Sequence, residues 1–418
     1  MRFILVLIGL FITLTGTAQD TLRLSMRQAD SLFLRTNVLL LAERFRIEAA
    51  QAEVIQASLL QNPTVSFELS AFNSASRTKV LDVGRQGQKI VSAEQLLFTG
   101  GKRNKRIALA QESARLTEYE FTDLLRGLRF ELRSRFYDTY FQQQTINRYT
   151  QQIQTIQQTV DAFEKQYERN NVSLRELLRL KALLFQLRND RTDILFQLAE
   201  NQQSLRTLLG TEFPVVPVVN EAGLLSYSIN GLSADSLRDT ALRQRSDLKA
   251  TQSLTKQAEL NYNLQKALAK PDVRLAGTYD QAGSYIPHYV GVGLAVDLPV
   301  FNRNQGAIKS ARSQISYQQQ YEKQKQLQIA NEVSTAFDKV VTVERMMQSV
   351  EGRFTDQFEQ LNLGITLNFG KGNISLLEFV DLIETYNESI RELNRLKADR
   401  IGAYEALTYA VGQDLFSR

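Results

Sequence analysis

The positions of the six prolines constrain the fold of this chain more than any other feature. A proline inside a helix removes a backbone hydrogen bond and clashes with the preceding turn. All six lie outside two long segments rich in Gln, Leu and Arg, 103–170 and 307–369. At about 1.5 Å per residue, either segment would form a helix of roughly 90–100 Å. The sequence therefore predicts a mainly helical fold built from long helices.

The segment after Asn171 has the 3,4 spacing of apolar residues that is typical of a coiled coil. All but two of the positions on this seam hold Leu or Ile. The seam consists of Leu177, Leu180, Leu184, Leu187, Arg191, Ile194, Leu198, Asn201, Leu205 and Leu208. We expect this helix to pack lengthwise against its neighbours.

Four short segments, 64–72, 88–98, 271–280 and 289–301, alternate apolar residues with small or polar ones. Strands of about ten residues with this alternation are typical of a transmembrane barrel wall, and a half-buried soluble hairpin shows the same pattern. In the barrel reading, the residues expected to face lipid are Phe67, Leu69, Val292, Leu294 and Val296. Those expected to face the lumen are Ser66, Glu68, Gly293 and Asp297.

The chain consists of two similar halves. The motif Asn-Val-Ser-Leu at 171–174 returns as Asn-Ile-Ser-Leu at 373–376, and Gly210 returns as Gly412. Each half, 19–210 and 237–418, is predicted to run helix, strand, strand, long helix, helix. The turns between the last two helices fall near 168–175 and 369–377. Segment 211–236, rich in Pro, Val, Gly and Ser, is expected to be a connector packed outside the main helices.

The first 18 residues have the features of an export signal. Met1-Arg2 gives a charged start, residues 3–15 are uncharged and mostly apolar, and Gly16 and Ala18 are the small residues that a signal peptidase recognises. The uncharged run is shorter than the roughly 20 residues that a membrane anchor needs. We therefore expect the mature chain to begin at Gln19.

The chain has no Cys and a single His, and this inventory argues against most catalytic and metal chemistry. Without Cys there are no disulfides, thiolate nucleophiles or Cys-bound metals. One imidazole per chain argues against Ser–His catalysis. We therefore expect no enzyme activity, no cofactor and no metal site. The net charge of +5 is spread among interleaved acidic and basic residues, so nucleic acid is not an expected partner.

Two hairpins supply four strands per chain, which is too few for a closed barrel, because membrane barrels start at about eight strands. Unpaired backbone groups at a sheet edge in lipid cost several kcal/mol each. If the strands enter a membrane, several chains must share one barrel. The number of strands is compatible with a dimer, a trimer or a tetramer.

Several motifs, in their order along the chain, resemble the TolC-like outer-membrane efflux factors. They are NPTV at 62–65, LFTGGKR at 97–103, LPVFNRNQG at 298–306 and the two Ser-containing turns. The resemblance implies a homotrimer with a shared twelve-stranded β-barrel in the outer membrane and a long α-helical barrel in the periplasm. It also implies a passive exit duct of a tripartite efflux system, with a periplasmic adaptor and an inner-membrane pump as partners.

The segment FNRNQG at 301–306 is most similar to the branch of this family associated with heavy-metal and cation efflux, and multidrug efflux is a second possibility. The exit channel of a type I secretion system is an alternative function. A periplasmic adaptor or a structural coiled-coil protein is another. An adaptor would not be expected to hold two complete helix–strand–strand–helix copies, and a coiled-coil protein would not explain the hairpins.

The duplicated turns are the expected gate. Ser173 with Glu176, and Ser375 with Glu378, fit the capping box, in which Ser accepts from the backbone three residues on and Glu accepts from the backbone of the cap. We expect both turns to restart a helix.

The resemblance implies that these turns form the periplasmic tip and that acidic residues after the second turn ring the narrowest point. Here those residues are Glu378 and Asp381, which Arg175 and Glu176 would face from the first repeat. At Glu378, helix capping and pore lining are both open. The family pattern has Asp in place of this Glu and a tip Arg in place of Ile374, so the hydrogen bonds of the tip are expected to differ.

Overall fold

The computed structural model describes residues 21–72, 80–81, 84, 87–224, 227–283, 286–350, 360 and 364–416. The expected export signal at 1–18 lies outside these residues. The described chain forms two compact units. The first contains the residues up to Leu41, Asp123–Arg245 and those from Gln328 onward, and the second contains Ala42–Thr122 and Ser246–Leu327.

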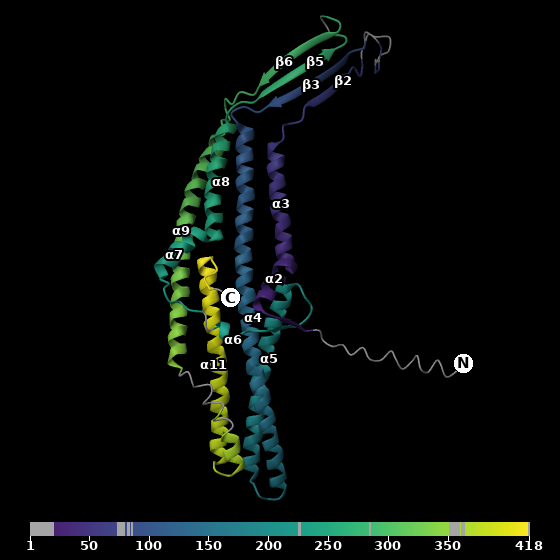
Figure 1. Cartoon of the computed structure of the whole chain (residues 1–418). Helices are drawn as coiled ribbons and strands as arrows, with labels where there is room; N and C mark the ends of the chain where they lie inside the picture. Colours follow the sequence, from purple (N-terminus) through teal and green to yellow (C-terminus); the bar gives the residue numbers. More distant parts are fainter. Residues whose placement is uncertain are drawn as a thin grey trace, which may run out of the picture. The chain divides into compact units, whose positions relative to one another are not determined.

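The second unit holds a four-stranded antiparallel sheet in the order β2-β3-β5-β6 (Figure 1). The strands are β2 (Thr64–Leu69), β3 (Lys89–Leu97), β5 (Val273–Asp280) and β6 (Tyr289–Val296). Both predicted hairpins therefore belong to one sheet, joined where β3 pairs with β5. β6 is shorter than the predicted segment because the chain turns after it, where the Val300 N–H donates to the Leu298 carbonyl at 2.9 Å.

The register of the sheet sorts its side chains into two faces. Phe67 pairs with Val91, Val91 with Tyr279, and Tyr279 with Val290. Because directly paired residues share a face, the residues predicted to face lipid all lie on one side of the sheet. Ser66 belongs to the other face, in one row with Ser92, Thr278 and Gly291.

Two helices of the second unit lead into the sheet, α3 (Val38–Ser58, whose first turn belongs to the first unit) and α8 (Ser246–Leu268). Two lead out of it, α4 (Lys102–Glu168) and α9 (Gln305–Ser349). Each repeat contains the same kind of contact across its hairpin. In both, a side chain just after the hairpin donates a hydrogen bond to a carbonyl near the end of the helix that comes before the hairpin. Arg103 Nε donates to the Ser58 carbonyl at 2.8 Å, and Asn304 Nδ2 donates to the Gln265 carbonyl at 2.9 Å.

The turn from β3 to α4 explains the LFTGGKR motif. Gly100 and Gly101 have φ angles of 62° and 68°, which glycine adopts without steric cost. This turn buries Lys102, whose Nζ lies 2.7 Å from Asp272 Oδ2 and donates to the Lys270 carbonyl. The motif therefore joins the two repeats at the base of the sheet.

The first unit is mainly helical. Its further elements are β1 (Leu22–Leu24), α2 (Met26–Thr36), α5 (Leu174–Leu209), β4 (Val215–Pro217), α6 (Glu221–Leu224), α7 (Ala234–Gln244) and α11 (Leu376–Val411). β1 pairs in parallel with β4, so the N-terminal strand is fixed to the segment between the repeats. The predicted seam of α5 is confirmed, because eight of its positions are buried and Arg191 and Leu198 are half-buried.

The short helices α2 and α7 begin the two repeats, each after a capping serine, Ser25 and Ser233. The second repeat therefore starts just inside the segment predicted as a connector. The residue that ends each short helix binds a carbonyl near the end of a long one. Asn37 Nδ2 donates to the Leu208 carbonyl at 2.9 Å, and Arg245 Nη1 donates to the Ala410 carbonyl at 3.0 Å. We refer to these as the paired joints.

The predicted fold class, mainly helical with a small sheet and in two repeats, is confirmed. Within the described residues, none of the helices combines the length and apolar character needed to cross a bilayer.

Candidate functional site

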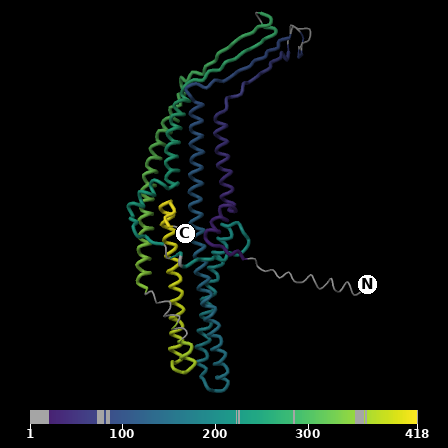
Figure 2. Tube along the Cα trace, viewed as in Figure 1, coloured from purple at the N-terminus to yellow at the C-terminus, as the bar shows by residue number. Residues whose placement is uncertain are grey.

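Two tip hairpins end at the same end of the first unit (Figure 2). The first runs from the end of α4 into α5, and the second runs from the helical residues 364–370 into α11. Their turns have the same hydrogen bonds. The Asn171 N–H donates to the Gln166 carbonyl, and the Asn373 N–H donates to the Asn368 carbonyl, both at 2.9 Å.

Both predicted capping boxes are present. The Ser173 N–H donates to Glu176 Oε2 at 2.8 Å, and the Glu176 N–H donates to Ser173 Oγ at 3.3 Å. Ser375 and Glu378 have the same geometry, with the same two distances. The backbone N–H and the hydroxyl of each serine stabilise the ionised carboxylate, and they lower the pKa values of Glu176 and Glu378. Glu378 therefore caps α11.

Arg175 and Asp381 are exposed in the first two turns of α5 and α11. Among the described residues of the single chain, neither side chain is within ion-pair distance of an opposite charge. The structure therefore brings Glu176 and Glu378 to their serines, but it does not bring Arg175 into contact with Glu378 or Asp381. An interaction of Arg175 with these acids stays a prediction, which concerns contacts between several copies of the chain.

The two tip hairpins share one hydrophobic core, which sequence periodicity missed. The core contains Ile156 and Val160 from α4, Leu177 and Leu180 from α5, and Phe379 from α11. Its partly buried rim includes Phe163 and Phe369, whose rings stack with centroids 5.7 Å apart. The seam of α5 predicted that other helices pack against it, but not that one of them, α11, comes from the other repeat.

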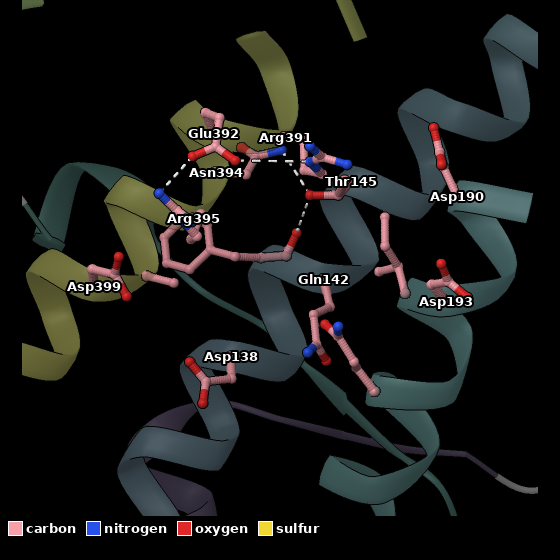
Figure 3. Close-up of a pocket in the computed structure, with 14 residues that line it drawn as sticks. Asp138, Gln142, Thr145, Asp190, Asp193, Arg391, Glu392, Asn394, Arg395 and Asp399 are labelled. Atoms are coloured by element: carbon pink, nitrogen blue, oxygen red, sulfur yellow. Dashed lines mark hydrogen bonds and ion pairs between the residues drawn. The ribbon is translucent and has the colours of Figure 1, made fainter. Parts of the chain in front are cut away.

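A polar cavity of about 460 Å³ lies between α4, α5 and α11 (Figure 3). Asp138 extends from α4 and Asp190 from α5, and burial raises the pKa values of both carboxyls. On α11, Arg395 pairs with Glu392 at 2.6 Å. The sequence gives one signal for this cavity, the acidic residues Asp190 and Asp193 next to the seam of α5. In the part of the chain that the structure describes, no cluster of His, Asp and Glu side chains could hold a metal ion.

Comparison with known families decides the identity. Residues 31–211 and 237–413, most of both repeats, match the family model described as outer membrane efflux protein. The chain belongs to the outer membrane efflux protein family. Among proteins of curated function, none matches the sequence.

Solved channel structures have the same fold. A CusC structure is 17% identical, with a TM-score of 0.75 over 95% of this chain and 96% of that one. The outer-membrane channel CmeC of Campylobacter jejuni is 12% identical, with a TM-score of 0.77 over 93% of this chain and 85% of that one. The open-state channel MtrE of Neisseria gonorrhoeae is 14% identical, with a TM-score of 0.70 over 93% of this chain and 89% of that one.

The resemblance to TolC-like channels is thereby confirmed. The efflux protein is an outer-membrane channel subunit of a tripartite efflux system, located in the outer membrane with a long periplasmic helical part. Family membership favours this role over a periplasmic adaptor or a structural coiled-coil protein.

Proposed function

We propose that three copies of the efflux protein form one passive exit duct, which receives substrate from an inner-membrane pump through a periplasmic adaptor. The sheet of the second unit carries this proposal. Within the described residues, its edge strands β2 and β6 each pair with one neighbour only. Because the strands alternate in direction, β6 of one copy can pair antiparallel with β2 of the next, and three copies would close twelve strands.

The apolar face of the sheet supports contact with lipid. Phe67 is 76% exposed and Val292 is 90% exposed, and a soluble monomer rarely leaves a contiguous apolar surface of this kind uncovered. The polar face bears Glu68, Glu94 and Asp297 as well as Arg274, which pairs with Asp297. This face would line the lumen with an excess of carboxylates.

The tip hairpins would form the periplasmic entrance. Three copies would bring Glu378 and Asp381 to one constriction, where crowded carboxylates attract cations. Arg175 of one copy would offset part of their repulsion when the tip is closed. Together with the acidic lumen and the resemblance of 301–306, this favours cations as the transported class, without a cofactor or a catalytic step.

The assembly is tested by fractionation and by mass. The protein should stay with the outer membrane after salt and carbonate washes, and native mass measurement in detergent should give three chains of the same length. A stable monomer, or release by the washes, would contradict the proposal.

The substrate class is tested by growth of a deletion strain on a panel of metal salts, cationic dyes and anionic detergents. We expect sensitivity to the cations, restored by the wild-type gene. Sensitivity confined to anionic compounds would contradict cation efflux. Loss of a secreted protein without any change in sensitivity would favour the type I secretion alternative.

A further inference from the structure

The hydrogen bonds of the sheet continue for one row beyond β5 and β6, at the end where the hairpins turn. The Gln281 N–H donates to the Lys89 carbonyl at 3.0 Å, and the His288 N–H donates to the Gln281 carbonyl at 3.1 Å. On its other side, Lys89 pairs with Leu69. Because directly paired residues share a face, Lys89 and His288 lie in one row on the apolar face that bears Phe67.

This row is the polar border of the apolar face. The row beside it consists of Phe67, Val91, Tyr279 and Val290. The helices of the second unit join the sheet at its opposite end (Figure 1). Because the helical part is periplasmic, the row of Lys89 and His288 would lie at the outer surface of the membrane when the apolar face contacts lipid.

Tyr279 fixes the imidazole of His288. The Tyr279 hydroxyl lies 2.8 Å from His288 Nδ1, and the two rings stack with centroids 6.2 Å apart and planes 24° apart. The backbone of His288 has a φ angle of 60°, a left-handed conformation in which His is enriched. When the hydroxyl donates to Nδ1, the ring proton is on Nε2. The exposed side chain of His288 then has one N–H that can donate to a ligand.

Lys89 adds a positive charge to this row. Within the described residues it has no ion-pair partner. The carboxylates of the neighbouring row, Glu68 and Asp280, belong to the other face, and Asp280 accepts from Gln88 Nε2 at 3.2 Å. Lys89 is half-buried, and a lysine at such a border can lay its aliphatic stem on apolar surface while its ammonium reaches water. A basic group at a membrane surface attracts anionic lipid headgroups.

We propose that Lys89 and His288 bind a phosphate group of an outer-leaflet lipid, with Tyr279 as the positioning residue for the imidazole. The site rests on the proposed contact of the apolar face with lipid. Lys89 and His288 are separated by one strand, so their backbones are about 9–10 Å apart. A phosphate above Gln281 is therefore within reach of both side chains. Lysine is a common phosphate ligand, and the acyl chains of the same lipid would lie against the row that contains Val91.

The test compares two lipids that differ only in phosphate. The detergent-purified protein is incubated with lipid A or with lipid A from which the phosphates have been removed, and native mass spectrometry measures the bound fraction. We expect the wild-type protein to bind the phosphorylated lipid several-fold more tightly. Equal binding of the two lipids would overturn the site without the use of any variant. Displacement of lipid A by inorganic phosphate at the same concentration would assign the site to free phosphate and would also overturn it.

Variants then identify the residues that are responsible. Lys89→Gln should lower the preference for the phosphorylated lipid several-fold, and so should His288→Asn, which tolerates the left-handed backbone. Lys89→Arg keeps the charge and should keep the preference. Tyr279→Phe loses only the hydroxyl, so it should lower the preference without weakening binding of the dephosphorylated lipid. Lys323→Gln, on the exposed surface of α9, is the matched control. Equal losses in Lys89→Gln and Lys323→Gln would overturn the site.

Membrane retention separates the site from the proposed function. A protein that stays with the outer membrane after the washes, but does not prefer the phosphorylated lipid, overturns the site and leaves the shared barrel. Retention together with a preference that Lys89→Gln loses supports both. Release by the washes, together with failure to bind either lipid, would contradict both the site and the contact of the sheet with lipid.

Discussion

The guanidinium of Arg133 and the carboxylate of Glu405 are buried together in the first unit, with Nη1 3.5 Å from Oε2. Asp30 of α2 and Asp414 near the C-terminus complete the group, at 3.1 and 3.0 Å. Burial lowers the pKa of Arg133, but the charges of Asp30 and Glu405 outweigh it and raise that pKa. The guanidinium therefore stays charged across the neutral range, and the group acts as a permanent tie between α2, α4 and α11.

Replacing Arg133 should lower the free energy of unfolding of the first unit. Arg133→Met would remove the guanidinium that pairs with the buried carboxylate of Glu405, and removing one partner of a buried ion pair typically costs about 3–5 kcal/mol. Thermal and denaturant unfolding of the purified protein would measure the loss. Arg238→Ala, which removes an exposed pair with Asp235, is the matched control and should cost at most about 1 kcal/mol. Equal losses in the two variants would contradict the role of the buried group.

A charge on the apolar face of the sheet should destabilise insertion. Val292→Arg should cost about 2–4 kcal/mol if Val292 lies near the bilayer midplane. The neighbouring position on the polar face, Gly293→Arg, is the control and should insert normally. Folding into lipid vesicles measured against urea would show the difference. Normal insertion of Val292→Arg with failure of Gly293→Arg would reverse the assignment of the faces.

Asp381→Asn should lower the preference of the channel for cations. The substitution removes one carboxylate per chain from the proposed constriction and leaves the capping box at Ser375 and Glu378 intact. The reversal potential in a salt gradient measures the effect. If ion preference is unchanged and thermal stability falls, Asp381 acts as an acid at a helix terminus and the constriction lies elsewhere.

Arg175→Ala should raise the resting conductance, because Arg175 is proposed to offset carboxylates of the closed tip. Arg175→Lys, which keeps the charge, should restore most of the closed behaviour. Added salt should raise the fraction of time that the wild-type channel is open, since it screens exposed ion pairs. An unchanged resting conductance in Arg175→Ala would contradict the proposed interaction.

The capping boxes predict a loss of stability at the tip in acid. The pKa values of Glu176 and Glu378 are lowered in the folded chain from the ordinary value of 4.5. The stabilisation is therefore present above pH 4.5 and is lost as the pH falls through the lowered values. Hydrogen exchange in the first turns of α5 and α11 should rise in that range. Glu378→Gln should flatten the response of α11 and leave that of α5 unchanged. The same response of α11 in the variant and in the wild type would contradict this prediction.

The elements and the two capping boxes could be predicted from sequence because their signals are local. The alternation around Phe67 and Val292 defines two faces of a strand, and Ser375 is three residues from Glu378. The contacts between repeats could not be predicted in this way. Phe163 meets Phe369, and Arg133 meets Glu405, only after helices far apart in the sequence have packed. Nothing in the spacing near either residue indicates its partner.

The paired joints have a consequence for the symmetry of the channel. Asn37 and Arg245 bind equivalent carbonyls with different side chains. The two halves of the chain can therefore have the same backbone arrangement although their side chains differ. Six copies of a half-length chain with one hairpin would supply as many strands and tip turns as three copies of this chain, but all six turns would be identical. In a trimer of the full chain, the two halves of each chain differ, so the symmetry is threefold and not sixfold. In the trimer that we propose, turns that carry Arg175 would alternate around the axis with turns that carry Asp381, which would place opposite charges next to each other in one ring.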